Sequence, residues 1–202
     1  MFIPKYTITT EINSRIAEIE RLRTVIDHAT IMPEIEVNLR FRATVVSVHS
    51  STSIEGNPLN ENQVRKVLKG EVVRAPDYAI MEVLNYKKAL DWLGQLEHTR
   101  QRLRLTDILT LHKLLMTKLL PDEKVGHWRP GPVYVVDEIK GKDVVRYTGP
   151  DAEDVPHLIT SFLQWIPSQY KTKLHPVLLA GLIHYLFVSI HPFLMVMAEP
   201  QD

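Results

Sequence analysis

Residues 175–193 read HPVLLAGLIHYLFVSIHPF, and this uncharged stretch decides the expected fold. Pro176 suits the first position of a helix and Pro192 cannot continue one, so we expect a helix that ends near His191. From Pro176 to Ala198 no side chain carries a formal charge, which is long enough for a membrane span. Because Pro192 would break such a span near its middle, a buried core helix is the favoured interpretation.

The composition indicates a folded protein without cysteine chemistry. The chain has 202 residues, with 24 basic and 24 acidic side chains, 9 His, 8 Gly and no Cys. A hydrophobic content of 45% excludes a disordered chain, and the neutral charge gives no general attraction to nucleic acid or an anionic membrane. The absence of Cys excludes disulfides, thiol nucleophiles and Cys-ligated zinc. The first residues lack the basic-then-apolar pattern of a signal peptide, so we expect a cytoplasmic protein.

Helical spacing of apolar residues extends through most of the chain. A first helix is expected from Ile12 to Ile26, behind an N-cap at Thr9 or Thr10. Further helices are expected at about residues 35–49, 61–68, 77–93, 106–120, 152–166 and 175–190, with Pro33, Asn60, Asp77 and Thr106 at or beside four of their starts. The polar segment at residues 50–58, SSTSIEGNP, separates the second helix from the third, and its Gly, Asn and Pro are stop signals.

One part of the chain departs from helical spacing. Two β-branched runs, at residues 133–136 and 144–147, flank a turn at Lys140-Gly141-Lys142. This pattern is typical of a β-hairpin. The expected fold class is therefore mainly α, with one β-hairpin.

Three histidines and one acid are candidates for chemistry. His184 and His191 are about two helical turns apart, whereas His175 lies on the opposite face, so a three-His metal site on this helix is disfavoured. His184 fits a core histidine. His191 ends an apolar helix and precedes a loop, as a general base requires, although these residues alone favour a helix-end His without a chemical role. Glu55, which precedes a Gly, equally fits a surface acid.

Several segments then form a recognisable order along the chain. Residues 51–56 read STSIEG, residues 126–129 read GHWR, the expected hairpin follows, and residues 191–193 read HPF. In this order and spacing they resemble the Fic (Fido) family of nucleotide-transferring enzymes, most of which are protein AMP-transferases. The resemblance covers nearly the whole chain and implies a Fic-type helical bundle. It also implies an N-terminal helical region at residues 1–100 and a Fic core at residues 101–202 that is incomplete at its C-terminal end.

The resemblance assigns positions to the family's functional segments. Ser51, Glu55 and Gly56 match the inhibitory motif S/T-x-x-x-E-G/N of the class with an N-terminal inhibitory helix. GHWR is similar to the family's G-x-x-R segment, and the hairpin to its target-docking flap. The residues assigned to the docking strand are Val133, Tyr134, Val135 and Val136.

The family signature reads H-P-F-x-D/E-G-N-G-R-x-x-R, and this chain matches it only at His191, Pro192 and Phe193. Residues 194–202 read LMVMAEPQD and lack the metal-binding acid, both glycines and both arginines. Read from the third base of codon 194, however, the codons for these residues permit D-G-N-G-R-x-x-R at the family spacing. Our hypothesis is that one base was lost at or just before codon 194, in the gene or in the recorded sequence, which truncates the motif. Sequencing the coding DNA tests this hypothesis.

The resemblance also implies a mechanism and its partners. His191 would act as general base on a Ser, Thr or Tyr hydroxyl of a target protein, and that hydroxyl would attack the α-phosphate of ATP. A Gly loop, Arg side chains and an acid-held Mg²⁺ would stabilise the phosphates. The flap strand would align the target by strand addition. Glu55 would pair with the second motif Arg and block the γ-phosphate, which is autoinhibition.

For this chain the resemblance implies a lost nucleotide site. Position 202 holds Asp202 instead of the second motif Arg, so we expect weak or absent ATP-Mg²⁺ binding and no AMP transfer, and we assign no metal ligand. The apolar run Leu194 to Met197 predicts homo-oligomerisation or aggregation. One alternative is a non-catalytic helical interaction module that keeps the flap. A membrane-associated helical protein is a further alternative, which rests only on the apolar C-terminal stretch.

Overall fold

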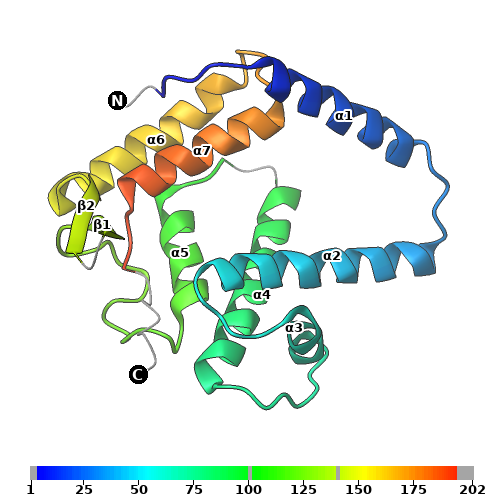
Figure 1. Cartoon of the computed structure of the whole chain (residues 1–202), viewed down its shortest axis with the longest axis horizontal. Coiled ribbons are helices and arrows are strands. Elements are labelled where there is room, and N and C mark those ends of the chain that lie inside the picture. Colours follow the sequence, from blue (N-terminus) through cyan, green and yellow to red (C-terminus); the bar gives the residue numbers. More distant parts are fainter. Residues whose placement is uncertain (1–3, 100–101, 140–141, 195–202) are drawn as a thin grey trace. The chain divides into compact units, whose positions relative to one another are not determined.

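The computed structural model describes residues 4–99, 102–139 and 142–194 (Figure 1). Within these ranges the chain forms seven α-helices, one short 3-10 helix and one two-stranded antiparallel sheet, which confirms the expected mainly α fold with one hairpin. It divides into two compact units, Met1–Ile31 with Arg129–Pro192 and Met32–Trp128 with Phe193–Asp202. Each unit therefore draws on both halves of the chain, and the domain boundary expected near residue 100 stays a prediction.

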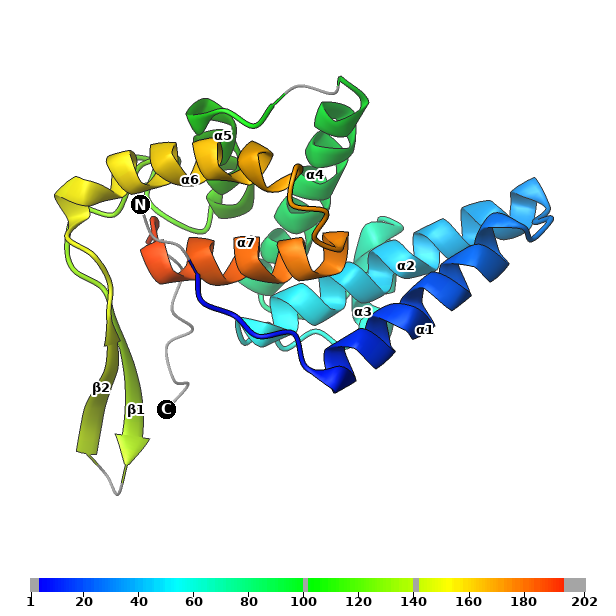
Figure 2. The ribbon, with the colours of Figure 1, turned by 90° about the horizontal axis from the view of Figure 1, so that it is seen from above.

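The first unit contains two packed helices, α6 (Val155–Gln169) and α7 (Pro176–Ile190), which lie side by side in Figures 1 and 2. Their shared core consists of Phe162, Trp165, Ile166, Leu179 and Leu186. Burying each of these large side chains contributes about 1.5–3 kcal/mol to folding. A helix of one turn, η1 (Ala152–Asp154), leads into α6. The apolar stretch that decided the expected fold is thus a helix packed against another helix.

The same unit carries helix α1 (Thr10–Asp27), whose N-cap was correctly predicted. The Thr9 hydroxyl accepts a hydrogen bond from the Ile12 N–H at 3.2 Å, which satisfies one of the free donors at the helix start. The apolar stripe of this helix has no fully buried member, and its C-terminal half is exposed. Helical spacing therefore predicted helix α1 correctly, although α1 is not part of the hydrophobic core.

The hairpin belongs to this unit as well and extends away from the start of α6 (Figure 2). Strand β1 (Tyr134–Ile139) pairs with β2 (Lys142–Thr148), and the register shifts between Val135 and Val136. Val135 lies opposite Tyr147 and Val136 opposite Val145, so β2 has one extra residue, a β-bulge, at this point. Of the expected turn, Lys140 and Gly141 lie outside the described residues.

The second unit contains α2 (Pro33–Ile54), α3 (Glu61–Leu68), α4 (Asp77–His98) and α5 (Leu105–Met116). Helices α2, α3 and α4 share a core made of Val45, Val48, Leu59, Val64, Val67, Ala79 and Val83. As expected, Asn60 caps α3, with its side chain accepting from the Gln63 N–H at 3.0 Å. Asn85 of α4 donates to the carbonyls of Leu115 and Thr117, which links α4 to the end of α5.

Two expected helix ends were wrong. Helix α2 continues through the Ser/Thr-rich segment to Ile54, because Val45 and Val48 are buried and the Thr52 hydroxyl donates back to the Val48 carbonyl at 3.0 Å. Helix α5 starts at Leu105, so Thr106 is inside the helix instead of capping it.

Among the described residues, no helix combines the length and the apolar character that crossing a membrane requires.

Candidate active site around His191

His191 occupies the first position after α7 and has an unusual backbone conformation. Its φ of 46° lies in the left-handed region, which non-glycine residues rarely adopt. The His191 N–H donates to the Phe187 carbonyl at 3.1 Å, which closes the last turn of the helix. The side chain is half-buried. The chain therefore reverses direction at the residue that the sequence singled out as a general base.

Arg129 holds this turn in place. Its Nε donates to the His191 carbonyl at 2.8 Å, and its backbone N–H donates to the Pro192 carbonyl at 2.9 Å. Its two terminal nitrogens donate to the carbonyls of Gly131 and Pro150, at the base of the hairpin. The residue is only 3% exposed, and burial lowers the pKa of its guanidinium. One buried cation thus joins the turn at His191 to both ends of the hairpin.

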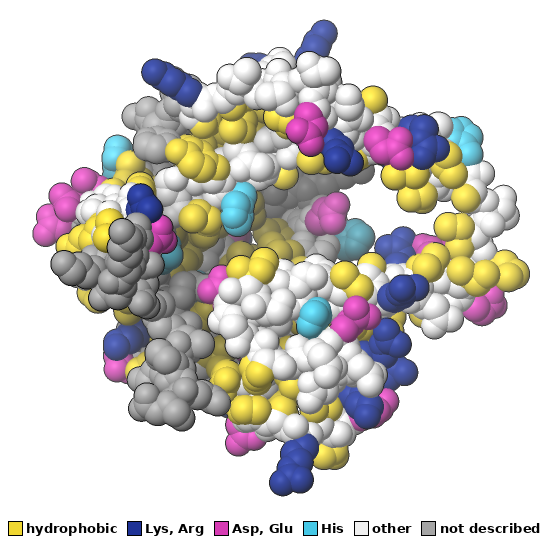
Figure 3. Space-filling model, in the orientation of Figure 1, with side chains coloured by type: hydrophobic (Ala, Val, Ile, Leu, Met, Phe, Trp, Pro, Cys, Tyr) yellow, Lys and Arg dark blue, Asp and Glu magenta, His cyan; other side chains and the backbone are white. Residues whose placement is uncertain are grey.

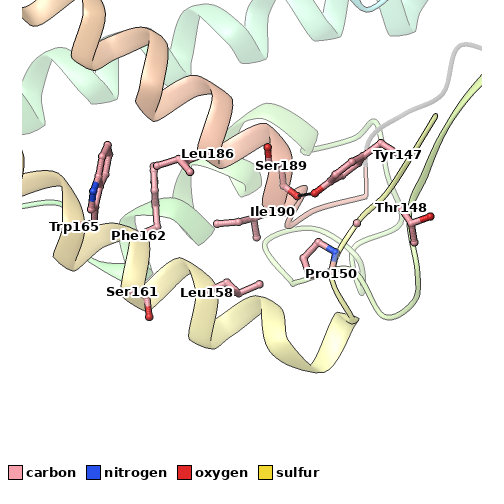
Figure 4. Close-up of a pocket in the computed structure, with 11 residues that line it drawn as sticks. Tyr147, Thr148, Pro150, Leu158, Ser161, Phe162, Trp165, Leu186, Ser189 and Ile190 are labelled. Carbon is pink, nitrogen blue, oxygen red and sulfur yellow. Dashed lines mark hydrogen bonds between the residues drawn. The ribbon is translucent and has the colours of Figure 1, made fainter. Parts of the chain in front are cut away.

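A second contact fixes the hairpin beside the end of α7. The Tyr147 hydroxyl, on β2, donates to the Ser189 carbonyl two residues before His191 (Figure 4). Burial raises the pKa of this hydroxyl, so it stays a donor throughout the physiological pH range. Gly149, just beyond β2, donates to the Val133 carbonyl at 2.9 Å. The hairpin base therefore cannot shift relative to the turn at His191 without breaking several hydrogen bonds.

An apolar cavity of about 310 Å³ lies next to this contact, between α6, α7 and the residues around the end of β2. Figure 4 shows Phe162, Leu186 and Ile190 among the side chains around it, with Tyr147 at one end. None of the residues that line this cavity carries a charge. The cavity suits an apolar group and provides no cation for a phosphate.

The expected docking residues lie on and just before β1. Val133 is half-buried at the hairpin base, whereas Tyr134, Val135 and Val136 are exposed, Tyr134 at 53%. In the described part of the chain, β1 and β2 pair only with each other, so each strand has one unpaired outer edge. Exposed β-branched side chains beside an unpaired edge suit the addition of another strand.

The remaining signature residue, Phe193, belongs to the second unit and stacks on a histidine that the sequence did not single out. The rings of Phe193 and His112 lie 4.1 Å apart and nearly parallel, and Trp128 stacks at 5.1 Å. His112 is 2% exposed, and its Nδ1 accepts from the Gly126 N–H at 3.0 Å. Its Nε2 must therefore carry the proton, which it donates to the Leu194 carbonyl at 3.1 Å.

His112 was missed because it lies within the apolar stripe of an ordinary helix. Its only sequence signal is a histidine four residues after Ile108 and four before Met116 on α5, where the helical spacing calls for a buried side chain. Burial lowers the pKa of the His112 imidazole, which agrees with a neutral ring. This residue therefore supports the signature segment and is not a candidate for proton transfer.

The expected inhibitory residues, Ser51, Glu55 and Gly56, lie in the second unit at the end of α2. Glu55 is the C-cap residue and is exposed, and Gly56 follows with a φ of 90°. Ser51 is half-buried, and its hydroxyl accepts from the Tyr86 hydroxyl at 2.7 Å. The motif thus forms the last turn and the cap of a helix, and not the isolated polar turn that we expected.

No group of three or more acidic, His or Cys side chains in the described residues could hold a metal ion. His175, one of the three C-terminal histidines, instead caps α7, with its Nδ1 accepting from the Val177 N–H at 3.3 Å. Its Nε2 donates to Glu20 of α1 at 3.0 Å. The positions that should carry the metal-binding acid and the second arginine, 195 and 202, lie outside the described residues.

The described residues around His191 do not fit a triphosphate. Every nitrogen of the Arg129 guanidinium already donates to a backbone carbonyl, so this side chain has no free fork for a phosphate. The adjacent cavity is apolar. A phosphate cradle would have to come from residues 195–202, where the sequence carries none of the signature residues.

The chain resembles known proteins across this whole arrangement. Residues 102–194 match the Fic/DOC family model. "Protein adenylyltransferase Fic" of Drosophila willistoni is 30% identical over 151 residues, which cover 73% of this chain and 28% of that protein. The crystal structure of a Fic family protein from Desulfovibrio desulfuricans G20 has a TM-score of 0.74 and 30% identity, covering 95% of this chain and 55% of that one. A Fic domain containing signaling protein from Bacteroides thetaiotaomicron VPI-5482 has a TM-score of 0.70 and 25% identity, covering 81% and 61%.

The arrangement of a mainly helical chain with a hairpin fastened beside the end of α7 is the class of fold seen in solved Fic family structures. The comparisons name the family directly, and this chain is a member of the Fic/DOC family. The matched region spans 28% of the length of the Drosophila willistoni relative.

Proposed function

We propose that this chain is a protein AMP-transferase module of the Fic type that keeps its base and its target-docking strand but lacks a working nucleotide site. The observation that carries the proposal is the buried Arg129, which fastens the turn at His191 to the base of the hairpin. A reaction between a target hydroxyl and a base needs these two elements at a fixed separation. The family match over residues 102–194 supports the same assignment.

In this proposal His191 accepts the proton of a target Ser, Thr or Tyr hydroxyl. Its half-buried side chain and restrained backbone suit a general base, which must be held rigidly and still reach its substrate. The described residues around His191 do not fit a triphosphate, so the proposed role of His191 is limited to the target hydroxyl.

The target polypeptide would add as a third strand to an open edge of the hairpin. Main-chain hydrogen bonds would supply affinity without fixing the target sequence, and the exposed side chains of Tyr134, Val135 and Val136 would contact alternate target residues. A docked target strand would be held close to the turn at His191, because Arg129 and Tyr147 anchor the hairpin base there.

Glu55 is proposed as the inhibitory residue of the intact lineage. In the family pattern this acid would pair with the second signature arginine, but this chain has Asp202 at that position. Two carboxylates would repel each other instead of forming an ion pair. In this 202-residue chain, inhibition by Glu55 is therefore proposed as latent.

The test uses the natural chain and a restored variant. The restored variant carries Met195→Asp, Val196→Gly, Met197→Asn, Ala198→Gly, Glu199→Arg and Asp202→Arg. With labelled ATP, Mg²⁺ and a lysate or self-modification as target, the natural chain should incorporate no AMP and show no thermal shift with nucleotide. The restored variant should gain a nucleotide-dependent rise in melting temperature of several degrees. Its AMP incorporation should rise when Glu55→Gly is added and fall at least 100-fold with His191→Asn.

Two results would overturn the proposal. AMP incorporation by the natural chain that depends on His191 would show that its nucleotide site is intact. No nucleotide binding by a folded restored variant would show that the His191 turn does not support the family chemistry.

The second candidate function is a non-catalytic interaction module, which the open hairpin edges favour. Both proposals predict target binding, so binding does not distinguish them. The restored variant does, because it should transfer AMP only if the chain is an AMP-transferase module. A hairpin substitution such as Val135→Pro should abolish target binding in either case, because proline removes a main-chain donor.

We also propose a second copy of this chain as a partner. In α1 the exposed apolar residues include Leu22, Val25 and Ile26, the last at 63% exposure. Val37 and Leu39 of α2 are also exposed, and Figure 3 shows apolar surface on both helices. Exposed apolar side chains gathered on a single helix, as on α1, are typical of a protein–protein contact.

A further inference from the structure

The inhibitory helix α2 ends in a specific hydrogen-bonded cap. The Gly56 N–H donates to the Ser53 carbonyl and the Asn57 N–H donates to the Thr52 carbonyl, each at 3.1 Å. This pair of bonds, with Gly56 at a positive φ of 90°, is a Schellman motif. The cap places Glu55 at the end of the helix, immediately before the residue where the chain turns away.

Asn57 holds this cap against α4. It is 6% exposed, and its amide nitrogen donates to the Ala79 carbonyl at 3.0 Å and to the Glu82 carboxylate at 2.7 Å. Its amide oxygen accepts from the Leu59 N–H at 3.0 Å. Both amide protons and the oxygen are therefore used, which makes Asn57 a fully satisfied buried anchor.

Glu82 contributes a charge as well as an acceptor. It is half-buried, and burial raises the pKa of its carboxyl, an effect that the nearby charge of Glu55 increases. The hydrogen bond from Asn57 acts in the opposite direction and stabilises the ionised form. A carboxylate at this position repels the carboxylate of Glu55, so it favours orientations of Glu55 that point away from α4.

We propose that Asn57 and Glu82 are positioning residues for Glu55, which fix the cap of α2 on α4 and direct the inhibitory carboxylate away from it. The inference rests on the proposed inhibitory role of Glu55. It adds two residues that the six-residue inhibitory motif does not contain, one of them on a different helix. The motif supplies the acid, and the Asn57–Glu82 pair determines where the acid points.

A second link between the same helices offers a matched control. The Tyr86 hydroxyl donates to Ser51 at 2.7 Å, about one helical turn before the cap. Tyr86→Phe removes this hydrogen bond and leaves Asn57 and Glu82 intact. A general loosening of α2 on α4 would follow from either substitution, whereas loss of the cap should follow only from changes at Asn57 or Glu82.

The first measurement is amide hydrogen exchange at residues 56 and 57 of the natural chain. Asn57→Ala should raise exchange there about tenfold or more, because it removes three hydrogen bonds. Glu82→Ala should raise it a few-fold. Glu82→Gln should leave it near the natural rate, because an amide oxygen can still accept from Asn57. Tyr86→Phe should also leave it unchanged.

The second measurement tests orientation and uses the restored variant described above. Asn57→Ala and Glu82→Ala should raise AMP incorporation toward the level of Glu55→Gly. Glu82→Gln keeps an acceptor for Asn57 and removes only the charge, so it should raise AMP incorporation less. Tyr86→Phe, which loosens α2 on α4 without removing the cap, should leave AMP incorporation at the level of the restored variant, so activation by the cap variants alone separates positioning from a general loosening of the helix.

Each outcome has a definite meaning. Equal exchange in Tyr86→Phe and Glu82→Ala, or no increase in Glu82→Ala, overturns the positioning role. If Asn57→Ala fails to fold, as circular dichroism would reveal, the Glu82→Ala and Glu82→Gln pair decides alone. If Glu55→Gly does not raise activity in the restored variant, the inhibitory role fails, whereas the exchange data still establish or reject the anchor.

Discussion

At the scale of single residues, His112 has a structural role that depends on its protonation state. Its Nδ1 accepts from the Gly126 N–H and its Nε2 donates to the Leu194 carbonyl, so only the neutral ring satisfies both partners. Burial lowers the pKa of His112 below the ordinary value of 6.5. The stability that it contributes is therefore present above pH 6.5 and is lost as the pH falls through its lowered pKa.

We predict that the natural chain loses several degrees of melting temperature between pH 7.5 and pH 5 and that His112→Phe reduces this loss. Phenylalanine keeps the ring stacked on Phe193 but cannot be protonated. At pH 7.5 the variant should be less stable by about 1–3 kcal/mol, because the Gly126 N–H and the Leu194 carbonyl lose their partner. Thermal unfolding followed by circular dichroism at both pH values measures the effect.

The control for this prediction is His28→Gln, which changes an exposed histidine at the end of α1. It should keep the pH dependence of the natural chain. An unchanged pH dependence in His112→Phe would exclude His112 as the source.

The sequence predicted some residues of the candidate site but not the role of others. His191 was found because a histidine between an apolar helix and Pro192 is an unusual pattern. Arg129 stood in the GHWR segment, but its role depends on carbonyls that are distant along the chain, at His191 and Pro150. Every residue has a backbone carbonyl, so the sequence pattern cannot predict which carbonyls an arginine will bind.

At the scale of elements, a side-chain hydrogen bond in the first unit ties α1 to α7. His175 caps α7 through Nδ1 and donates to Glu20 of α1 through Nε2. This hydrogen bond lowers the pKa of Glu20, so the carboxylate remains ionised well into the acidic range. Helix α1 has no fully buried residue, and Ile12 and Ile16 are only half-buried, so we expect this hydrogen bond to carry much of its attachment.

We predict that Glu20→Ala raises deuterium uptake across α1 a few-fold and leaves α7 unchanged. The substitution removes the tether but keeps the cap, because the Val177 N–H still reaches His175. His175→Ala should raise uptake in both helices, since it removes the tether and the cap together. Equal uptake in α1 of Glu20→Ala and the natural chain would show that this helix is held in another way.

Local hydrogen bonding explains which elements the sequence predicted. The N-cap expected at Thr9 or Thr10, the N-cap at Asn60 and the two β-branched runs of the hairpin are short-range signals. The structure has Thr9 and Asn60 as caps and a two-stranded hairpin. The extension of α2 to Ile54 was missed because burial of Thr52 and the hydrogen bond from Tyr86 to Ser51 outweigh the weak helix preference of serine and threonine. Tertiary packing of this kind is not visible in the sequence of residues 50–54 themselves.

At the scale of the whole molecule, exposed apolar surface predicts self-association. Sedimentation velocity over a concentration range of about 5–100 μM should show a dimer or larger species whose share rises with concentration. Leu22→Glu with Ile26→Lys should shift the natural chain toward monomer, because both side chains are exposed on α1. Asn13→Lys, which adds a charge to α1 without removing an apolar group, is the control. A monomer across the whole range would refute this partner.

The overall architecture was predictable because helical spacing and one hairpin account for most of the described chain. The division into units was not predictable, since it joins Met1–Ile31 to the distant segment Arg129–Pro192. Sequence spacing carries no information about such distant contacts. The hydrogen bond between Glu20 and His175 is an example of such a contact between distant segments.

The left-handed backbone of His191 also affects the choice of an inactive enzyme for binding experiments. Alanine at this position would be less favourable than histidine, because it lacks the polar side chain that helps histidine, asparagine and aspartate adopt a left-handed backbone, here with a φ of 46°. A reduced affinity for targets could then arise from a displaced turn instead of a missing imidazole. Asparagine tolerates this conformation better than most residues, so His191→Asn is the safer bait for capturing target proteins.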